Sequence, residues 1–338
     1  SQVKDCEAII FDLRGNGGGF LDQVVEIVNE FLPQGQLIVY TEDRYGKRIN
    51  EYSNGRGKYT ETDIVVLVDE FSASSSEILA GAVQDNDRGL VIGRRTFGKG
   101  LVQAQIPFND GSAMRLTVAR YYTPTGRSIQ KPYVNGDEKA YHMDLINRIN
   151  HHELFSADSI HFDDAMKFTT PGGRTVYGGG GIMPDIEIKD SSKVDICYSL
   201  YIDNYFFDYA TRYYRLHNSI AHPKVFELTE ADINDFCAYL EERGFSYETE
   251  TSKFFADMLK MAENEDIDST TFAQLKAFEP ILKPDFRAAI ERNIDEVKQL
   301  LGSEIVLRYY YQKGYYAYML RFDPELERAL QEIGKAEQ

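Results

Sequence analysis

The sequence predicts a mixed α/β domain over residues 1–190 and a mostly α-helical domain over residues 191–338. In the first part, short apolar runs alternate with glycine-rich turns, whereas in the second part apolar residues recur at helical spacing. The chain has 338 residues, which exceeds the usual size of a single hydrophobic core. We therefore expect two domains, each with its own core.

Apolar runs and the turns between them define the elements expected in the first domain. The buried strand AIIFDL is followed by a glycine-rich turn and then by the helical pattern FLDQVVEIVNEFL, which ends at Pro33. Further strands are expected at QLIVYT, DIVVLV and GLVIG. LVQAQIPF and SAMRLTVARYY alternate apolar and polar residues around the turn NDG, a pattern that predicts an antiparallel hairpin.

Helical patterns dominate after Asp195. The segment YSLYIDNYFFDYATRYYRL repeats aromatic residues at helical spacing, and we expect this stripe to pack in a core rather than to bind a ligand. Thr229 is expected to cap a helix that ends at Gly244. The last helix is expected to begin with Asp323 as its N-cap and Pro324 at its first position.

Composition and charge disfavour several classes of function. The net charge of −17 argues against nucleic acid as a partner, because binding phosphates needs a basic surface. No run of about 18 apolar residues occurs, so a membrane span is not expected. The cysteines and histidines show no metal-ligand spacing. The first residues contain no signal-peptide pattern and enter an apolar strand at once, as in a piece of a longer chain.

Ser74, in the segment SASSSEILAGAVQD, has two interpretations. Glu77 follows three residues later, which fits a capping box at the start of a helix. A serine at a helix start can also be a nucleophile, because backbone N–H groups and the positive helix end favour negative charge there. The local sequence leaves both interpretations open.

Lys99 lies in GRRTFGKG, which fits a phosphate-binding loop except at its last position. Gly100 stands where that loop needs Ser or Thr, and a strand pattern follows where a helix should begin, so nucleotide binding is disfavoured. Lys99 is then either a solvated turn residue or, if buried, a neutral amine that can take a proton from a serine. No histidine lies within residues 70–100, so Ser/Lys is the available pair of nucleophile and base.

The glycines of DLRGNGGGF lie between a predicted strand and a predicted helix. Glycines at such a turn can direct backbone N–H groups toward one point, as an oxyanion hole requires, because no side chain obstructs them. A simple strand-to-helix turn would have the same composition.

Five motifs occur in the order found in C-terminal processing peptidases, also called tail-specific proteases. The motifs are DLRGNGGG, SASSSEILAGAVQD, TFGKGLVQ, YYTPTGRSIQKPY and GRTVYGGGGIMPDI. The chain resembles this family of Ser/Lys serine proteases over roughly residues 8–188. The resemblance implies that Ser74 is the nucleophile, Lys99 the general base and Gln103 the residue that orients the lysine.

The same resemblance implies that the backbone N–H groups of Gly19 and Ser75 form the oxyanion hole. Ser75 stands where alanine is commoner in the family, but its backbone N–H is the relevant group, so activity is expected to survive. Ser75 is the less favoured nucleophile, because the spacing to Lys99 fits Ser74. Asp85 matches an aspartate that supports the site in some members, and the alternative is a surface carboxylate at a helix end.

By this resemblance the first domain is a crotonase-like (ClpP/crotonase) protease core. The implied activity is that of a serine endopeptidase, which cleaves polypeptides from or near their C-terminal ends through an acyl-enzyme without a metal or organic cofactor. The implied location is the periplasm or cell envelope. The helical part resembles the C-terminal extension of Bacteroidetes-type members.

The sequence departs from the family pattern before DLRGNGGG, where a PDZ module and further core segments are usual. We therefore expect an N-terminally truncated core, completed by an upstream PDZ segment or by a partner chain in a homo-oligomer. Two alternatives remain: a catalytically silent polypeptide-binding module on the same scaffold, and a crotonase-like acyl-CoA enzyme.

Overall fold

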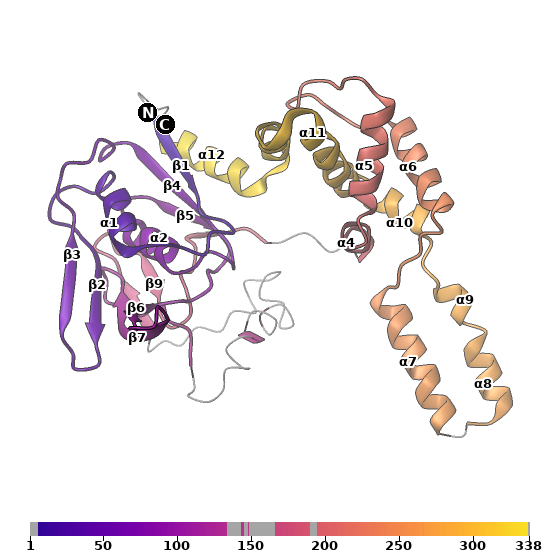
Figure 1. The fold of residues 1–338 in the computed structure, drawn as a ribbon, viewed down its shortest axis with the longest axis horizontal. Coiled ribbons are helices and arrows are strands. Elements are labelled where there is room, and N and C mark those ends of the chain that lie inside the picture. Colours follow the sequence, from indigo (N-terminus) through magenta and orange to yellow (C-terminus); the bar gives the residue numbers. More distant parts are fainter. Residues whose placement is uncertain are drawn as a thin grey trace. The chain divides into compact units, whose positions relative to one another are not determined.

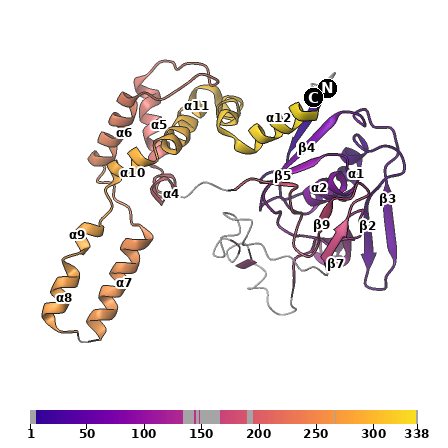
Figure 2. The same ribbon diagram turned by 180° about the vertical axis from the view of Figure 1, so that it is seen from behind.

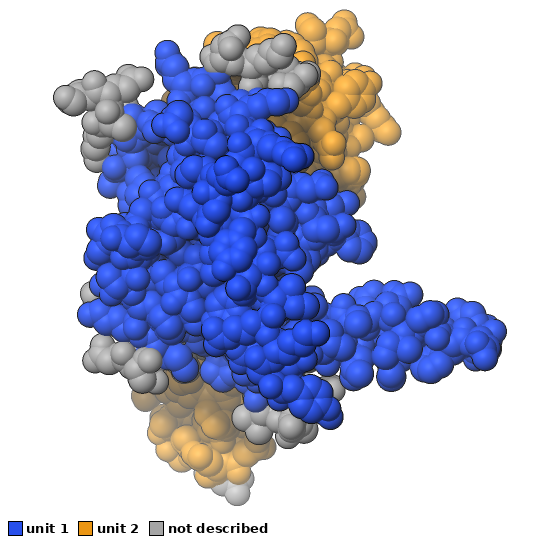
Figure 3. Space-filling model, turned by 90° about the vertical axis from the view of Figure 1, so that its left-hand side faces the viewer, with its two compact units in different colours: residues 1–191, 324–338 blue, residues 192–323 orange. Residues whose placement is uncertain are grey.

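The computed structural model of the chain forms two compact units. It describes residues 6–133, 143–144, 148, 166–189, 195–265 and 267–336. The first unit comprises residues 1–191 and 324–338, and the second comprises residues 192–323 (Figure 3). The expected boundary after residue 190 stays a prediction, but the last helix clusters with the first unit and not with the helical one.

The first unit is built on a parallel sheet with strand order β1-β4-β5-β10, of which Figure 1 labels β1, β4 and β5. Its strands are β1 (Ala8–Asp12), β4 (Asp63–Val68), β5 (Leu90–Gly93) and β10 (Ile186–Glu187). The apolar runs AIIFDL, DIVVLV and GLVIG thus form the predicted strands. A run without polar alternation is what a strand covered on both faces requires.

Both faces of this sheet are covered by helices. Ile64, Val66 and Val68 pack in one core with helices α1 (Leu21–Asn29) and α2 (Ser75–Asp85). The alternate residues of β4 face a smaller core with Ala329, which lies on α12 (Pro324–Ala336). The last helix of the sequence therefore belongs to the core of the first unit.

A second sheet of the first unit is antiparallel, with strand order β3-β2-β7-β6; β3, β2 and β7 are labelled in Figure 2. Its strands are β2 (Leu37–Asp43), β3 (Arg48–Tyr52), β6 (Leu101–Pro107) and β7 (Ala113–Tyr122). The predicted hairpin around NDG is confirmed, because β6 and β7 pair from Leu101 to Pro107. The described residues also include a short hairpin of β8 (Lys167–Thr169) and β9 (Thr175–Tyr177).

The second unit is helical, as the periodicity predicts. It contains α4 (Asp195–Ile202), α5 (Tyr205–Leu216), α6 (Glu230–Glu242), α7 (Glu250–Asn264), α8 (Ser269–Lys276), α9 (Glu279–Leu282), α10 (Phe286–Arg292), α11 (Ile294–Met319) and the 3-10 turn η3 (Leu320–Phe322). Thr229 caps α6 by accepting a hydrogen bond from the backbone of Asp232. The aromatic stripe of α5 is buried through Phe206, Tyr209 and Tyr213, which confirms that it is core.

None of the helices that the structure describes combines the length and the apolarity needed to cross a membrane.

Candidate active site

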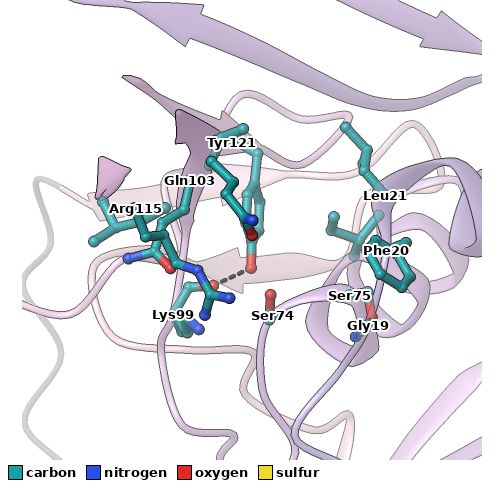
Figure 4. Close-up of a pocket in the computed structure, with 13 residues that line it drawn as sticks. Gly19, Phe20, Leu21, Ser74, Ser75, Lys99, Gln103, Arg115 and Tyr121 are labelled. Atoms are coloured by element: carbon teal, nitrogen blue, oxygen red, sulfur yellow. Dashed lines mark hydrogen bonds between the residues drawn. The ribbon is translucent and has the colours of Figure 1, made fainter. Parts of the chain in front are cut away.

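A cavity of about 530 Å³ lies in the first unit, between the glycine-rich turn after β1, the start of α2 and the β6–β7 hairpin (Figure 4). Its lining includes the five residues to which the resemblance gives a direct catalytic part: Gly19, Ser74, Ser75, Lys99 and Gln103. These residues come from three segments of the sequence, and the fold brings them to one hollow. Their chemical roles stay predictions.

Ser74 lies at the junction between β4 and α2 in an unusual backbone conformation. Its φ of 59° and ψ of −117° put a non-glycine residue at positive φ. Such strain costs free energy and is found mainly where surrounding contacts enforce it for function. The preceding residue, Ala73, donates its backbone N–H to the carbonyl of Asn16 at 3.0 Å and thereby joins this junction to the glycine-rich turn.

The close approach of these two loops explains one glycine of DLRGNGGG. A Cβ atom on Gly18 would lie 2.5 Å from the carbonyl oxygen of Ala73 and 2.8 Å from the backbone nitrogen of Ser75. Gly18 also has a φ of +92°, which side-chain-bearing residues rarely adopt. Only glycine therefore lets the turn lie against the start of α2.

Glu77 connects the loop that bears Ser74 with the loop that bears Lys99, here called the lysine loop. Its Oε2 accepts the backbone N–H of Ser74 and the backbone N–H of Lys99, both at 2.8 Å. Its Oε1 accepts the Thr96 hydroxyl at 2.6 Å and the Gly98 N–H at 2.7 Å. Glu77 is fully buried, and burial raises the pKa of its carboxyl group, while these four hydrogen bonds oppose the rise.

The two interpretations of Ser74 are thus compatible. The capping contact predicted for Glu77 is present, and it is made with the backbone of Ser74. The second contact of the same carboxylate, with Lys99, could not be read from the local sequence, because it joins residues 22 positions apart. Glu77 is the principal site residue that the sequence indicated only as a helix cap.

The backbone around Lys99 is fixed from several directions. The N–H of Gly100 donates to the side-chain oxygen of Gln130 at 2.9 Å, and the N–H of Lys131 donates to the carbonyl of Gly98 at 2.9 Å. The Tyr121 hydroxyl donates to the carbonyl of Lys99, the contact marked in Figure 4. The chain then enters β6, not a helix, which agrees with the argument against a phosphate-binding loop.

The Gly19 amide, expected to be an oxyanion donor, already has an acceptor. Its N–H donates to the hydroxyl of Ser75, with nitrogen and oxygen 2.5 Å apart. The side chain of Ser75, considered above only as the less favoured nucleophile, thus occupies the donor that the resemblance assigns to substrate.

Asp85 is not a surface carboxylate, so that interpretation is wrong. It is 1% exposed and accepts hydrogen bonds from the backbone N–H of Thr125 at 3.0 Å, the hydroxyl of Thr125 at 2.7 Å and the guanidinium of Arg127 at 2.6 Å. Asp85 does not line the cavity. It holds the loop that leads to Gln130 and Lys131, the two residues bonded to the backbone on either side of Lys99.

Eight further lining residues were not singled out as site residues from the sequence, among them Phe20, Leu21, Arg115 and Tyr121. Phe20 and Leu21 lie on the side of the glycine-rich turn, and Arg115 and Tyr121 lie on β7. The alternation of apolar and polar residues in β7 predicts a strand with one polar face. It does not predict that this face lines the cavity beside Ser74, because that depends on contacts between distant segments.

Known proteins resemble both parts of the chain. Residues 1–140 match the family described as Peptidase family S41, and residues 196–333 match a family described as the C-terminal helical domain of a probable PDZ-protease. A carboxyl-terminal-processing protease of Synechocystis sp. is 42% identical over 137 residues, which are 40% of this chain and 32% of that protein. A carboxy-terminal-processing protease of Bartonella bacilliformis is 47% identical over 122 residues, 36% of this chain and 28% of that protein.

Among solved structures, the photosystem II D1 C-terminal processing protease matches 54% of this chain and 35% of its own at 30% identity, with a TM-score of 0.38. The resemblance to C-terminal processing peptidases is therefore confirmed at the level of sequence. The chain spans about a third of the length of the curated relatives that it matches.

Proposed function

We propose that the chain, whose residues 1–140 match peptidase family S41, is a serine endopeptidase with a Ser74/Lys99 dyad. Its substrates are polypeptides with accessible C-termini, which it cleaves from or near that end. The observation that best supports this proposal is the double contact of Glu77. One buried carboxylate accepts the backbone N–H groups of both Ser74 and Lys99, so the two loops that bear nucleophile and base are held in one arrangement.

The proposed reaction has two halves. The neutral amine of Lys99 accepts the hydroxyl proton of Ser74 as Oγ attacks the peptide carbonyl carbon. The oxyanion that forms accepts hydrogen bonds from the backbone N–H groups of Gly19 and Ser75. The Lys99 ammonium then donates its proton to the leaving amine, and the C–N bond breaks to give an acyl-enzyme. Water, deprotonated by Lys99, releases the acyl group, and Gln103 orients the lysine throughout.

Asp85 supports this reaction indirectly. Its hydrogen bonds to Thr125 and Arg127 stabilise the loop that continues to Gln130. Because the Gln130 side chain accepts the N–H of Gly100, this loop fixes the backbone next to Lys99.

The fold family of the first unit, the segment that completes it and the cellular location are part of the same proposal. A parallel sheet with helices α1 and α2 on one face is compatible with a crotonase-like core, and an upstream PDZ segment or a second copy of the chain would complete it. The proposed location is the periplasm or cell envelope.

The test compares the wild-type chain with Ser74→Ala and Lys99→Met on unstructured polypeptides with free C-termini, with products identified by mass spectrometry. The proposal expects cleavage by the wild type, a rate lower by roughly 1000-fold or more in both variants, and a trapped acyl-enzyme on Ser74 only. Cleavage that survives Ser74→Ala would overturn the assignment of the nucleophile. Peptide binding without cleavage by any form would favour the catalytically silent module.

A further inference from the structure

The cavity has two chemically different sides, with the hydroxyl of Ser74 between them (Figure 4). On one side lie the apolar side chains of Phe20 and Leu21. On the other lie the polar or charged side chains of Lys99, Gln103 and Arg115, and Leu101 and Val102 of β6 also line the cavity. A polypeptide whose scissile bond lies at Ser74 would therefore present its two halves to different surroundings.

Arg115 belongs to the polar side through the register of the hairpin. It pairs with Gln105, and Gln103 pairs with Thr117 two positions further along. Residues that face each other across two strands point to the same side of the sheet, as do residues two apart along one strand. Gln103, Gln105 and Arg115 thus form one polar face, and all three line the cavity.

The Arg115 guanidinium is exposed to this cavity, and within the described part of the chain it makes no hydrogen bond or ion pair. A guanidinium group offers paired N–H donors whose geometry fits a carboxylate. The protein has a net charge of −17, yet the Arg115 guanidinium lies beside the proposed nucleophile without a counter-ion among the described residues. A bound anionic group would supply that counter-ion.

The proposed reaction indicates which half of the substrate meets Arg115. The ammonium of Lys99 must reach the nitrogen of the leaving amine, so the leaving segment extends along the side of the cavity where Lys99 lies. Arg115 is on that side, whereas Phe20 and Leu21 lie on the opposite side of Ser74, where the acyl half of such a substrate would extend.

We propose that Arg115 binds a carboxylate on the C-terminal side of the scissile bond and so determines which bonds are cleaved. The inference rests on the proposed endopeptidase function. The carboxylate has two sources, the side chain of an Asp or Glu shortly after the bond and the free α-carboxylate of a short tail. Both offer the same planar pair of oxygens.

The experiment uses one parent peptide in which each of the three positions after the cleaved bond is Glu or Gln, and in which the end is a free acid or a carboxamide. The wild type is expected to prefer the anionic form at one position, or at the free end, by roughly tenfold or more in kcat/KM, as for a charge-assisted hydrogen bond. Arg115→Gln should remove this preference, and Arg115→Lys should retain part of it. Arg56→Gln, at an exposed arginine outside the cavity, is the matched control and should behave as the wild type.

Two outcomes separate this inference from the proposed function. If the wild type cleaves, Ser74→Ala does not, and Arg115→Gln still discriminates Glu from Gln and free acid from carboxamide, Arg115 does not read a carboxylate. If no form cleaves, binding of the anionic and neutral peptides is measured by calorimetry instead. Equal affinity of the wild type and Arg115→Gln for the anionic peptides would then overturn the inference as well.

Discussion

The backbone N–H of Gly19 donates a hydrogen bond to the hydroxyl of Ser75 at 2.5 Å. In the proposed reaction the same N–H must stabilise the substrate oxyanion. A hydroxyl that already occupies the donor competes with the oxyanion, so the side chain of Ser75 has to turn away, or share the donor, as the tetrahedral intermediate forms.

Replacing Ser75 with alanine removes this competing acceptor and leaves the backbone N–H of residue 75 in place. We expect Ser75→Ala to raise kcat by up to roughly fivefold, since the net worth of one neutral hydrogen bond is about 1 kcal/mol. The measurement is kcat on one peptide, with Ser75→Thr as the variant that keeps a hydroxyl. A lower kcat in Ser75→Ala, at an unchanged melting temperature, would mean that the hydroxyl assists the reaction.

Substituting Glu77 tests whether its carboxylate, which accepts the N–H groups of both Ser74 and Lys99, determines the geometry of the dyad. A glutamine has one acceptor oxygen, so Glu77→Gln leaves one pair of donors facing an NH₂ group: either the N–H groups of Ser74 and Lys99, or the Thr96 hydroxyl and the Gly98 N–H. Because the site is fully buried, we expect a loss of about 3 kcal/mol in the free energy of unfolding.

Urea unfolding measures that loss, and kcat of the fraction that stays folded measures the effect on the site. A positioning role predicts that kcat falls while KM changes little. Glu77→Gln with wild-type kcat in the folded fraction would make Glu77 a purely structural residue.

The sequence predicted features that depend on neighbours along the chain. An unbroken apolar run does not suit a half-exposed strand, which predicts DIVVLV as a buried strand, and Thr229 is predicted as a cap because capping is local. AIIFDL forms a strand as predicted, but its residues are only partly buried, because β1 lies at the edge of the sheet. Contacts between distant segments could not be predicted in this way. The burial of Asp85 depends on Arg127, and the second contact of Glu77 depends on the fold of the lysine loop.

The pKa of Asp87 gives a prediction for acid stability. Burial acts to raise the pKa of Asp87, but hydrogen bonds from Arg174, Thr170 and Gly172 and the charge of Arg174 outweigh it, so the pKa is lowered from its ordinary value of 3.8. A lowered pKa in the folded state means that the ionised form stabilises the fold. This contribution is present above pH 3.8 and is lost as the pH falls through the lower, folded-state pKa.

Asp87→Asn should therefore reduce the free energy of unfolding near neutral pH by about 1 kcal/mol, since the pair with Arg174 is partly exposed and screened by solvent. The difference between wild type and variant should shrink as the pH is lowered below 4. Urea titrations between pH 7 and pH 3 measure it, and a difference that stays constant with pH would show that the charge of Asp87 does not contribute.

Glu325 explains why α12 joins the first unit although its sequence continues the helical part. Its carboxylate oxygens lie 3.3 Å from an Arg14 nitrogen and 2.8 Å from an Arg94 nitrogen, and Arg94 also pairs with Glu70 at 2.8 Å. Arg14 begins the glycine-rich turn, Glu70 precedes Ser74, and Arg94 precedes the lysine loop. The helix thus binds near the base of all three loops that form the cavity.

Glu325→Gln removes one of two carboxylates beside each arginine, since Arg94 keeps Glu70 and Arg14 keeps Asp12, so we expect a loss of about 1 kcal/mol in the free energy of unfolding. Hydrogen exchange should become faster in α12 and in the glycine-rich turn. Glu327→Gln, an exposed change on the same helix, is the control. If hydrogen exchange becomes faster in α12 alone and kcat is unchanged, the ion pairs of Glu325 hold the helix in place but do not stabilise the loops that form the cavity. If the turn also loosens and kcat falls, the C-terminal helix is part of what holds the active site together.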